Sequence, residues 1–228
     1  MTQDTVKDFY ERNFRLSPSN QEYCFRPARS ERYFSVFNIL ESLQVKPRAV
    51  ELGFGGRQNL RWLSELCETL TIVDIVDRAG ELEFPNLRFV EGDLNKNFPF
   101  RSSEFDLVIA LMVIEHLFDP FHSFSQVSRI LKPGGKTIIN LPLVTGIKNR
   151  VRLLFGIPPI TSRKDWYSTR EWDGGHLHYF SIALVKRLGA DHGLELLSCY
   201  PCGNLTLLKR IFPSLLCGEM SFIFQRKY

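Results

Sequence analysis

Residues 50–56 read Val-Glu-Leu-Gly-Phe-Gly-Gly, and Asp74 follows at the end of the next apolar run, 74 − 53 = 21 positions after Gly53. The order along the chain is strand, glycine turn, helix, strand and acidic end. Glycines in such a turn let backbone N–H groups approach a ligand closely, because no Cβ stands in the way. The helix after the turn directs its positive end at the same place. The stretch therefore predicts a site for a nucleoside cofactor.

The rest of the chain continues this alternation of strands and helices. Helical spacing of apolar residues marks 31–43, 59–70, 121–131 and 181–192, and apolar runs typical of strands mark 49–52, 69–75, 87–90, 105–111, 136–141, 194–200 and 220–225. Continuous apolar strands between helices indicate a parallel sheet that is covered on both faces. Residues 142–175 interrupt the pattern with a basic, irregular stretch. We therefore predict an α/β, doubly wound fold with an insert after the fifth strand.

Length and composition set further limits. The chain has 228 residues, 44% of them hydrophobic, which suits one globular domain. A net charge of +4 is too small to indicate nucleic-acid binding by itself. No apolar run approaches the roughly 18 residues of a membrane span, and the start lacks a signal peptide's apolar stretch. We expect a cytoplasmic protein without a membrane span.

The cysteines do not indicate a metal site. There are five of them, and the Cys199-x-x-Cys202 spacing has no second pair to complete a zinc set. We therefore expect the cysteines to be structural and predict no metal ligands.

Details of the glycine turn favour one class of cofactor over another. A dinucleotide fingerprint would place a third glycine at position 58, where this chain has Gln58. Glu51, two positions before Gly53, is awkward beside a pyrophosphate but suits a cationic amino-acid tail. Asp74 can accept hydrogen bonds from both ribose hydroxyls, and Asp93, after the third strand, from the amine of adenine. A nicotinamide oxidoreductase is therefore disfavoured.

Five segments of the chain, in order, resemble the motifs of the class I S-adenosylmethionine-dependent methyltransferases of the small-molecule type. They are Val-Glu-Leu-Gly-Phe-Gly-Gly (50–56), Val-Asp-Ile (73–75), Glu-Gly-Asp-Leu (91–94), Phe-Asp-Leu-Val-Ile-Ala-Leu-Met-Val-Ile-Glu-His-Leu (105–117) and Leu-Lys-Pro-Gly-Gly (131–135). The resemblance extends over roughly residues 31–200. Arg57 departs from the pattern, since a glycine is usual there, and it either crowds the carboxylate of the cofactor or pairs with it.

The resemblance implies a seven-stranded sheet whose last strand is antiparallel to the other six. It implies a single methyltransferase domain over 1–228, with an N-terminal helical cap (1–45) and a substrate-side insert (143–178). The implied cofactor is S-adenosyl-L-methionine, with S-adenosyl-L-homocysteine as product. The residues expected to bind it are Glu51, Gly53, Gly55, Asp74, Ile75, Asp93, Leu94, Ala110 and Leu111.

The fourth strand bears on the acceptor. It lacks the Asn/Asp-Pro-Pro-aromatic run of adenine methylases, and the Pro201-Cys202 pair lies far from it in sequence. We therefore expect a small-molecule or carrier-linked acceptor, methylated at oxygen, and no nucleic-acid substrate. The alternatives are a protein or nucleic-acid methyltransferase that uses the basic insert, and a non-catalytic S-adenosylmethionine-binding module. The sequence does not indicate an oligomeric state.

Two histidines, His176 and His178, are the candidate catalytic residues. They lie in Gly-Gly-His-Leu-His-Tyr-Phe-Ser (174–181), between the insert and the next helix. Because the pKa of imidazole lies near working pH, either residue could act as the base for a hydroxyl. The alternative is that they bond loop backbone while Ser181 caps the helix. We expect His116 to have a structural role in the strand–helix connection.

The insert is expected to cover the substrate side. It offers flat aromatic surfaces (Trp166, Tyr167 and Trp172) and cationic side chains for anions (Arg150, Arg152, Arg163 and Lys164). The run Leu-Leu-Phe-Gly-Ile (153–157) could dock a lipid-linked or bulky substrate, or a neighbouring subunit. The alternative for the cations is a solvated basic face.

Overall fold

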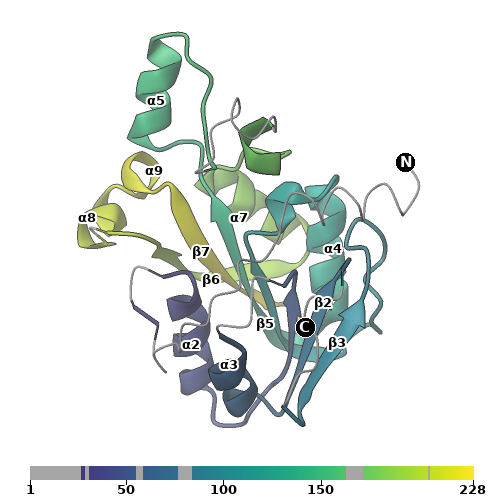
Figure 1. Cartoon of the computed structure of the whole chain (residues 1–228). Coiled ribbons are helices and arrows are strands. Elements are labelled where there is room, and N and C mark those ends of the chain that lie inside the picture. Colours follow the sequence, from purple (N-terminus) through teal and green to yellow (C-terminus); the bar gives the residue numbers. More distant parts are fainter. Residues whose placement is uncertain (1–26, 29–30, 55–58, 77–83, 163–171, 205) are drawn as a thin grey trace.

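A computed structural model describes residues 27–28, 31–54, 59–76, 84–162, 172–204 and 206–228 (Figure 1). Gly55, Arg57, Arg163, Lys164, Trp166 and Tyr167 lie outside these ranges. The described part is built on one seven-stranded sheet, in the order β3-β2-β1-β4-β5-β7-β6. The strands are β1 (Arg48–Leu52), β2 (Thr69–Asp74), β3 (Leu87–Glu91), β4 (Phe105–Leu111), β5 (Leu131–Pro142), β6 (Leu194–Pro201) and β7 (Glu219–Arg226).

The strand directions confirm the predicted topology. β1 pairs in parallel with β2 and β4, β3 joins β2 in parallel, and β5 joins β4 in parallel. The last strand, β7, runs antiparallel to both of its neighbours, β5 and β6. Six strands therefore share one direction, and the carboxyl ends of β1, β2, β3, β4 and β5 meet at one edge.

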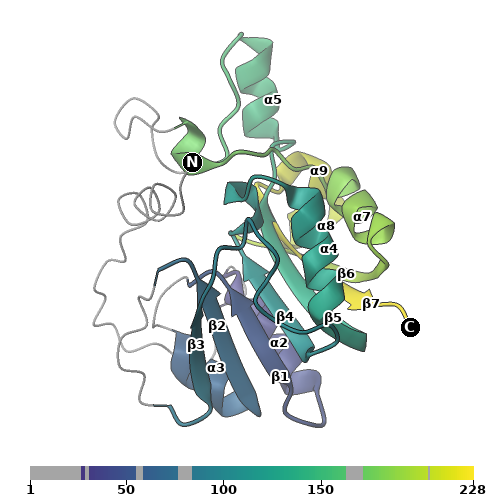
Figure 2. The ribbon, with the colours of Figure 1, turned by 90° about the vertical axis from the view of Figure 1, so that its right-hand side faces the viewer.

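Helices cover both faces of the sheet, as Figures 1 and 2 show. α2 (Tyr33–Ser42) and α3 (Leu60–Leu66) lie on one face, and α4 (Pro120–Ile130) and α7 (Ile182–Asp191) lie on the other. Side chains of β1 alternate between the two layers, since Ala49 packs with the core under α2 and α3, and Val50 with the core under α4 and α7. This alternation places Glu51 on the α2–α3 face.

The two helices of the second face begin at side-chain caps. The Asp119 carboxylate accepts hydrogen bonds from the backbone N–H groups of Phe121 (2.8 Å) and His122 (3.1 Å) at the start of α4. The Ser181 side chain accepts one from Leu184 N–H (3.2 Å) at the start of α7. These contacts satisfy donors that the first turn of a helix leaves unpaired. The alternative of an N-cap at Ser181 is thus confirmed.

The expectation that residues 142–175 are irregular is wrong in one respect, because they contain the helix α5 (Ile147–Leu154). α5 stands away from the sheet (Figure 1), and its apolar side chains Val151, Leu153 and Leu154 are exposed. Ile147, Val151 and Leu154 do follow helical spacing, but the helix has only eight residues, fewer than the window of about 11–18 over which periodicity identifies a helix. Two short helices before β7, α8 (Thr206–Ile211) and α9 (Pro213–Leu216), were missed for the same reason.

None of the helices in the part of the chain that the structure describes has both the length and the apolar character that crossing a bilayer requires.

The contact between α7 and β7 gives a first testable prediction. A Cβ added at Gly189 would lie 2.4 Å from Cε1 of Phe224, a ring that is fully buried and has no space to move. We expect Gly189→Ala to lower the free energy of unfolding by about 1–3 kcal/mol through overpacking, measured by urea denaturation. Gly218→Ala is the control, because nothing lies within 4 Å of a Cβ there. Equal stabilities for the two variants would contradict this packing.

Candidate cofactor and acceptor site

The predicted cofactor residues gather at the carboxyl ends of the parallel strands. The chain runs from β1 to β2 on one side of the sheet and to β4 on the other, so the strand order reverses at β1. Ligands of open α/β sheets bind in the crevice that such a reversal opens. Glu51 and Gly53 lie at the end of β1, Asp74 ends β2, and Asp93 follows β3. The topology thus brings the three carboxylates to one edge.

The turn after β1 requires a glycine at its first position. Gly53 has a φ of +76°, and an added Cβ would lie 2.9 Å from Cγ2 of Val113. The Gly53 N–H continues the ladder by donating to the Val73 carbonyl (2.8 Å), and the Phe54 N–H donates to Oδ2 of Asp74 (2.7 Å). Backbone and carboxylate therefore hold one another at this turn. Gly55, also predicted to bind cofactor, lies outside the described residues.

Glu51 is a buried carboxyl group with one hydrogen-bond donor that the sequence did not reveal. Its side chain is 3% exposed, and the Tyr33 hydroxyl from α2 donates to its Oε1. Burial raises the pKa of Glu51 to about 7, although the hydrogen bond from Tyr33 opposes the rise. Burial and the nearby Glu51 together raise the pKa of Tyr33. A cationic ligand group would relieve the cost of ionising Glu51 here.

Tyr33 was missed because its position in the helix 31–43 reads as part of an apolar face. The hydroxyl was the available signal, since a buried tyrosine O–H usually finds a polar partner.

Asp74 and Asp93 are held by neighbouring amides. Besides Phe54, Asp74 receives a longer hydrogen bond from the Val76 N–H to Oδ1 (3.4 Å). Oδ1 of Asp93 accepts from the backbone N–H (2.9 Å) and the side-chain amide (3.1 Å) of Asn95. Fixed carboxylates of this kind can accept from ligand hydroxyls or amines without first having to be ordered.

The four predicted apolar contacts differ in accessibility. Ile75 and Leu94 are 8% and 7% exposed, beside the two aspartates in sequence. Ala110 is fully buried in the core under α4 and α7, whereas Leu111 is half-buried and packs on the α2–α3 side. Their contact with a cofactor stays a prediction.

The structure separates the two candidate histidines. Nε2 of His178 lies 2.9 Å from the Leu117 carbonyl and 3.2 Å from that of Phe118, so it donates to the loop after β4. His176 is 5% exposed, and burial lowers its pKa, opposed by the charge of Asp173. His176 is therefore neutral at physiological pH. His178 instead hydrogen-bonds to backbone carbonyls, as the alternative interpretation expected.

Hydrogen bonds fix which ring nitrogen of His176 carries the proton. The Thr161 hydroxyl donates its one hydrogen to Oδ2 of Asp173 (2.5 Å) and lies 2.7 Å from Nδ1 of His176. Since that hydroxyl can only accept from the ring, Nδ1 is the protonated nitrogen and Nε2 keeps its lone pair. The Asp173 carboxylate also accepts hydrogen bonds from the backbone N–H groups of Thr161 and Ser162. Its burial would raise its pKa, but these hydrogen bonds lower it on balance.

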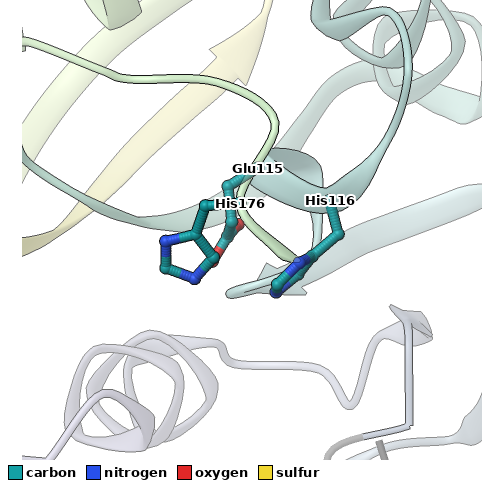
Figure 3. A group of neighbouring side chains, drawn as sticks. All are labelled: Glu115, His116 and His176. Carbon is teal, nitrogen blue, oxygen red and sulfur yellow. The ribbon is translucent and has the colours of Figure 1, made fainter. Parts of the chain in front are cut away.

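His116 is adjacent to His176, although the sequence suggested only a structural role for it. The 3-10 helix η2 (Ile114–His116) follows β4, and η3 (Trp172–Gly175) precedes His176. The two imidazole rings meet edge to face with their centroids 4.8 Å apart. Glu115, also from η2, lies beside them (Figure 3). No sequence pattern joined these residues, because about 60 positions separate the two segments.

The described part of the insert offers fewer free cations than expected. Arg150 donates to the Thr145 carbonyl (2.8 Å) and Arg152 to the Pro158 carbonyl (2.9 Å). Trp172 is 60% exposed. Leu153, Leu154 and Phe155 expose 57%, 80% and 72% of their surface, which leaves an apolar tip on α5.

Comparison with known proteins finds a methyltransferase domain in the part of the chain that carries these residues. Residues 50–139, which include Glu51, Asp74 and Asp93, match the family model described as "Methyltransferase domain". The uncharacterized protein YafE of Escherichia coli (strain K12) is 31% identical over 87 residues, 38% of this chain. The match spans 42% of the length of that relative.

Solved structures share the fold over most of the chain. One comes from a complex between the Haloferax volcanii Trm112 methyltransferase activator and a protein assigned as a methyltransferase. The TM-score is 0.61 and the identity 16%, and the match covers 99% of this chain and 95% of that one. Another is the Burkholderia thailandensis 1,6-didemethyltoxoflavin-N1-methyltransferase with bound 1,6-didemethyltoxoflavin and S-adenosylhomocysteine, with a TM-score of 0.60, 14% identity, and coverage of 87% and 80%. At such identities the likeness is one of fold.

Proposed function

We propose that this chain transfers a methyl group to an oxygen of a small-molecule or carrier-linked acceptor. It is a class I S-adenosylmethionine-dependent methyltransferase by its fold and by the methyltransferase domain in residues 50–139. The observation that carries the proposal is the buried Glu51 carboxyl beside a turn that only glycine can make. A buried carboxyl group whose pKa is raised by burial suits a cationic ligand group and disfavours a pyrophosphate.

The residues at the strand ends fit three of the polar parts of this cofactor. Glu51 would hold its ammonium group, Asp74 its ribose hydroxyls and Asp93 its adenine amine. Gly53 would let the backbone approach the amino-acid portion. When bound, S-adenosylmethionine supplies an electrophilic methyl group on a sulfonium. An acceptor oxygen would attack this methyl group in line with the carbon–sulfur bond, and S-adenosylhomocysteine would leave. The protein's main task is then to align the acceptor and exclude water.

Of the two candidate histidines, we propose His176 as the residue that acts on the acceptor hydroxyl. Its Nε2 keeps a lone pair, because Nδ1 donates to Thr161. As the oxygen–methyl bond forms and the carbon–sulfur bond breaks, the hydroxyl proton must leave, and a neutral imidazole is suited to receive it. His178 would act by holding the loop after β4 in place.

The exposed apolar tip of α5 favours a bulky or carrier-linked acceptor. The engagement of Arg150 and Arg152 with backbone carbonyls gives no support to a polyanion. To identify the acceptor class, the protein would be incubated with cell extract and methyl-labelled S-adenosylmethionine. We expect label in small molecules or in a carrier-bound group released by mild base. Label that is removed only by protease or nuclease digestion would favour the protein or nucleic-acid alternative, and binding without transfer would favour a cofactor-binding module.

The role of Asp74 gives a second prediction. We expect Asp74→Asn to weaken S-adenosylhomocysteine binding by about 1.5–3 kcal/mol, the scale of hydrogen bonds to a charged group, measured by calorimetry. Asp106→Asn is the control, because that carboxylate pairs with Lys132 at the opposite end of β4 and should leave the affinity unchanged. An Asp74 variant that binds like wild type would refute the ribose assignment, and a folded wild type that fails to bind near micromolar concentration would refute the cofactor.

A further inference from the structure

Glu115 is a fully buried carboxyl group that finds no hydrogen-bond donor among the described residues. It is 0% exposed, and both of its oxygens are buried and lack a hydrogen-bond partner there. Burial raises the pKa of Glu115 to about 8. Its own backbone N–H, which does not reach hydrogen-bond geometry, and the charge of Arg32 act in the opposite direction, but Arg32 also pairs with Glu219 (3.3 Å). Leaving such a group unsatisfied is costly, because desolvation of a carboxylate is not repaid without a partner. Its position therefore requires an explanation.

The two nearest histidines are arranged as metal-binding histidines usually are. One ligand atom each from Glu115, His116 and His176 lie within 4.8 Å of one another, and the three side chains lie together in Figure 3. Nδ1 of His116 donates to the Gly175 carbonyl (2.9 Å), and Nδ1 of His176 donates to Thr161. Each ring is thus oriented through Nδ1 and keeps its Nε2 lone pair as an acceptor. Metal-ligating histidines are typically fixed by such a second hydrogen bond.

We propose that Glu115, His116 and His176 bind a divalent first-row transition-metal ion, with zinc as the reference case. Two imidazoles and a carboxylate form a ligand set that such ions accept, and a three-residue set leaves a coordination position open. Ligands around tetrahedral zinc lie roughly 3.4 Å apart, so atoms that now lie up to 4.8 Å apart would approach one another by up to about 1.4 Å when the ion binds. The Glu115 carboxylate gains the positive partner that it lacks.

This site extends the proposed function and replaces one part of it. A ring nitrogen that binds an ion no longer accepts a proton, so His176 would act on the acceptor hydroxyl through the metal. An acceptor oxygen in the open position would lose its proton more easily, because a bound cation lowers the pKa of a coordinated hydroxyl. The metal site itself does not depend on the methyl-transfer proposal, because the ion is held by protein side chains alone.

The experiment uses the full chain, freed of metal with a chelator and titrated with zinc by calorimetry and with cobalt by absorption. We expect one ion per chain, a tetrahedral cobalt spectrum and no thiolate charge-transfer band. Glu115→Gln should weaken zinc binding by about 100-fold or more. Thr161→Val, which removes the acceptor for Nδ1 of His176, should weaken it by about 10–100-fold. The control His122→Gln alters a half-buried histidine that bonds the Lys96 carbonyl and should bind zinc like wild type.

S-adenosylhomocysteine affinity, measured on the same samples, reports folding and keeps the two proposals separable. We expect it to be unchanged in Glu115→Gln. Zinc binding that is equal in wild type and Glu115→Gln, or a cobalt spectrum with a thiolate band, would overturn the metal site even if the cofactor binds. If Glu115→Gln does not fold, Thr161→Val decides, and zinc affinity equal to wild type would then reject the proposal.

Discussion

The affinity for S-adenosylhomocysteine is expected to rise about tenfold between pH 6 and pH 8, and Glu51→Gln is expected to remove this dependence. Burial raises the pKa of Glu51 to about 7. The ligand ammonium requires the ionised carboxylate, which about one molecule in eleven provides at pH 6 and ten in eleven at pH 8. Binding therefore strengthens as pH rises through the pKa of Glu51. The measurement is calorimetry across this range in buffers of different ionisation enthalpy, which also reports the proton released.

Glu51→Gln should bind about 10–150-fold more weakly than wild type at pH 8, the equivalent of about 1.5–3 kcal/mol for a hydrogen bond to a charged group. The neutral amide keeps an acceptor for the Tyr33 hydroxyl, so the turn should keep its shape. 5′-Methylthioadenosine, which lacks the ammonium group, is the matched ligand. It should bind both proteins alike and independently of pH. A pH dependence that persists in Glu51→Gln would place the titrating group elsewhere.

The sequence predicted most of the fold because the central strands of the sheet bury continuous apolar runs. All seven strands, and the helices of both faces, lie where apolar spacing indicated them. α5 escaped prediction because it has only eight residues, although Ile147, Val151 and Leu154 follow helical spacing along it. Local periodicity thus identifies an element only where the pattern extends over enough residues.

The residues of the candidate site also differ in whether the sequence could predict them. Glu51, Gly53 and Asp74 could be found because each has a fixed place relative to one strand–turn–helix unit. Tyr33 could not, because its contact with Glu51 depends on how α2 packs across the sheet. Glu115 and His176 could not be joined either, because they lie on segments about 60 positions apart that meet only in the folded chain. Contacts between distant segments are set by tertiary packing, and no spacing in the sequence records them.

Gly53→Ala is expected to lower the free energy of unfolding by about 2–4 kcal/mol, from two causes that can be separated. The φ of +76° costs a residue with a Cβ about 1–2 kcal/mol. The contact with Cγ2 of Val113 at 2.9 Å adds the cost of overpacking. Val113→Ala in the same chain removes Cγ2 and leaves only Cβ, 3.3 Å away, so it relieves the closest contact but not the backbone strain. Denaturant unfolding of both single variants and the double variant should therefore show a favourable coupling of about 1 kcal/mol.

Cofactor affinity should respond differently from stability in this series. The Phe54 N–H reaches Asp74 only if the turn keeps its left-handed residue, so a backbone that relaxes at position 53 moves both groups. We expect Gly53→Ala to bind S-adenosylhomocysteine at least tenfold more weakly than wild type. Adding Val113→Ala to this variant should restore stability more than binding. If binding recovered fully in the double variant, the close contact alone would explain the glycine, and the φ of Gly53 would not matter for the cofactor. If it does not recover, the conformation of the backbone at Gly53, rather than the space around it, is what the cofactor site requires.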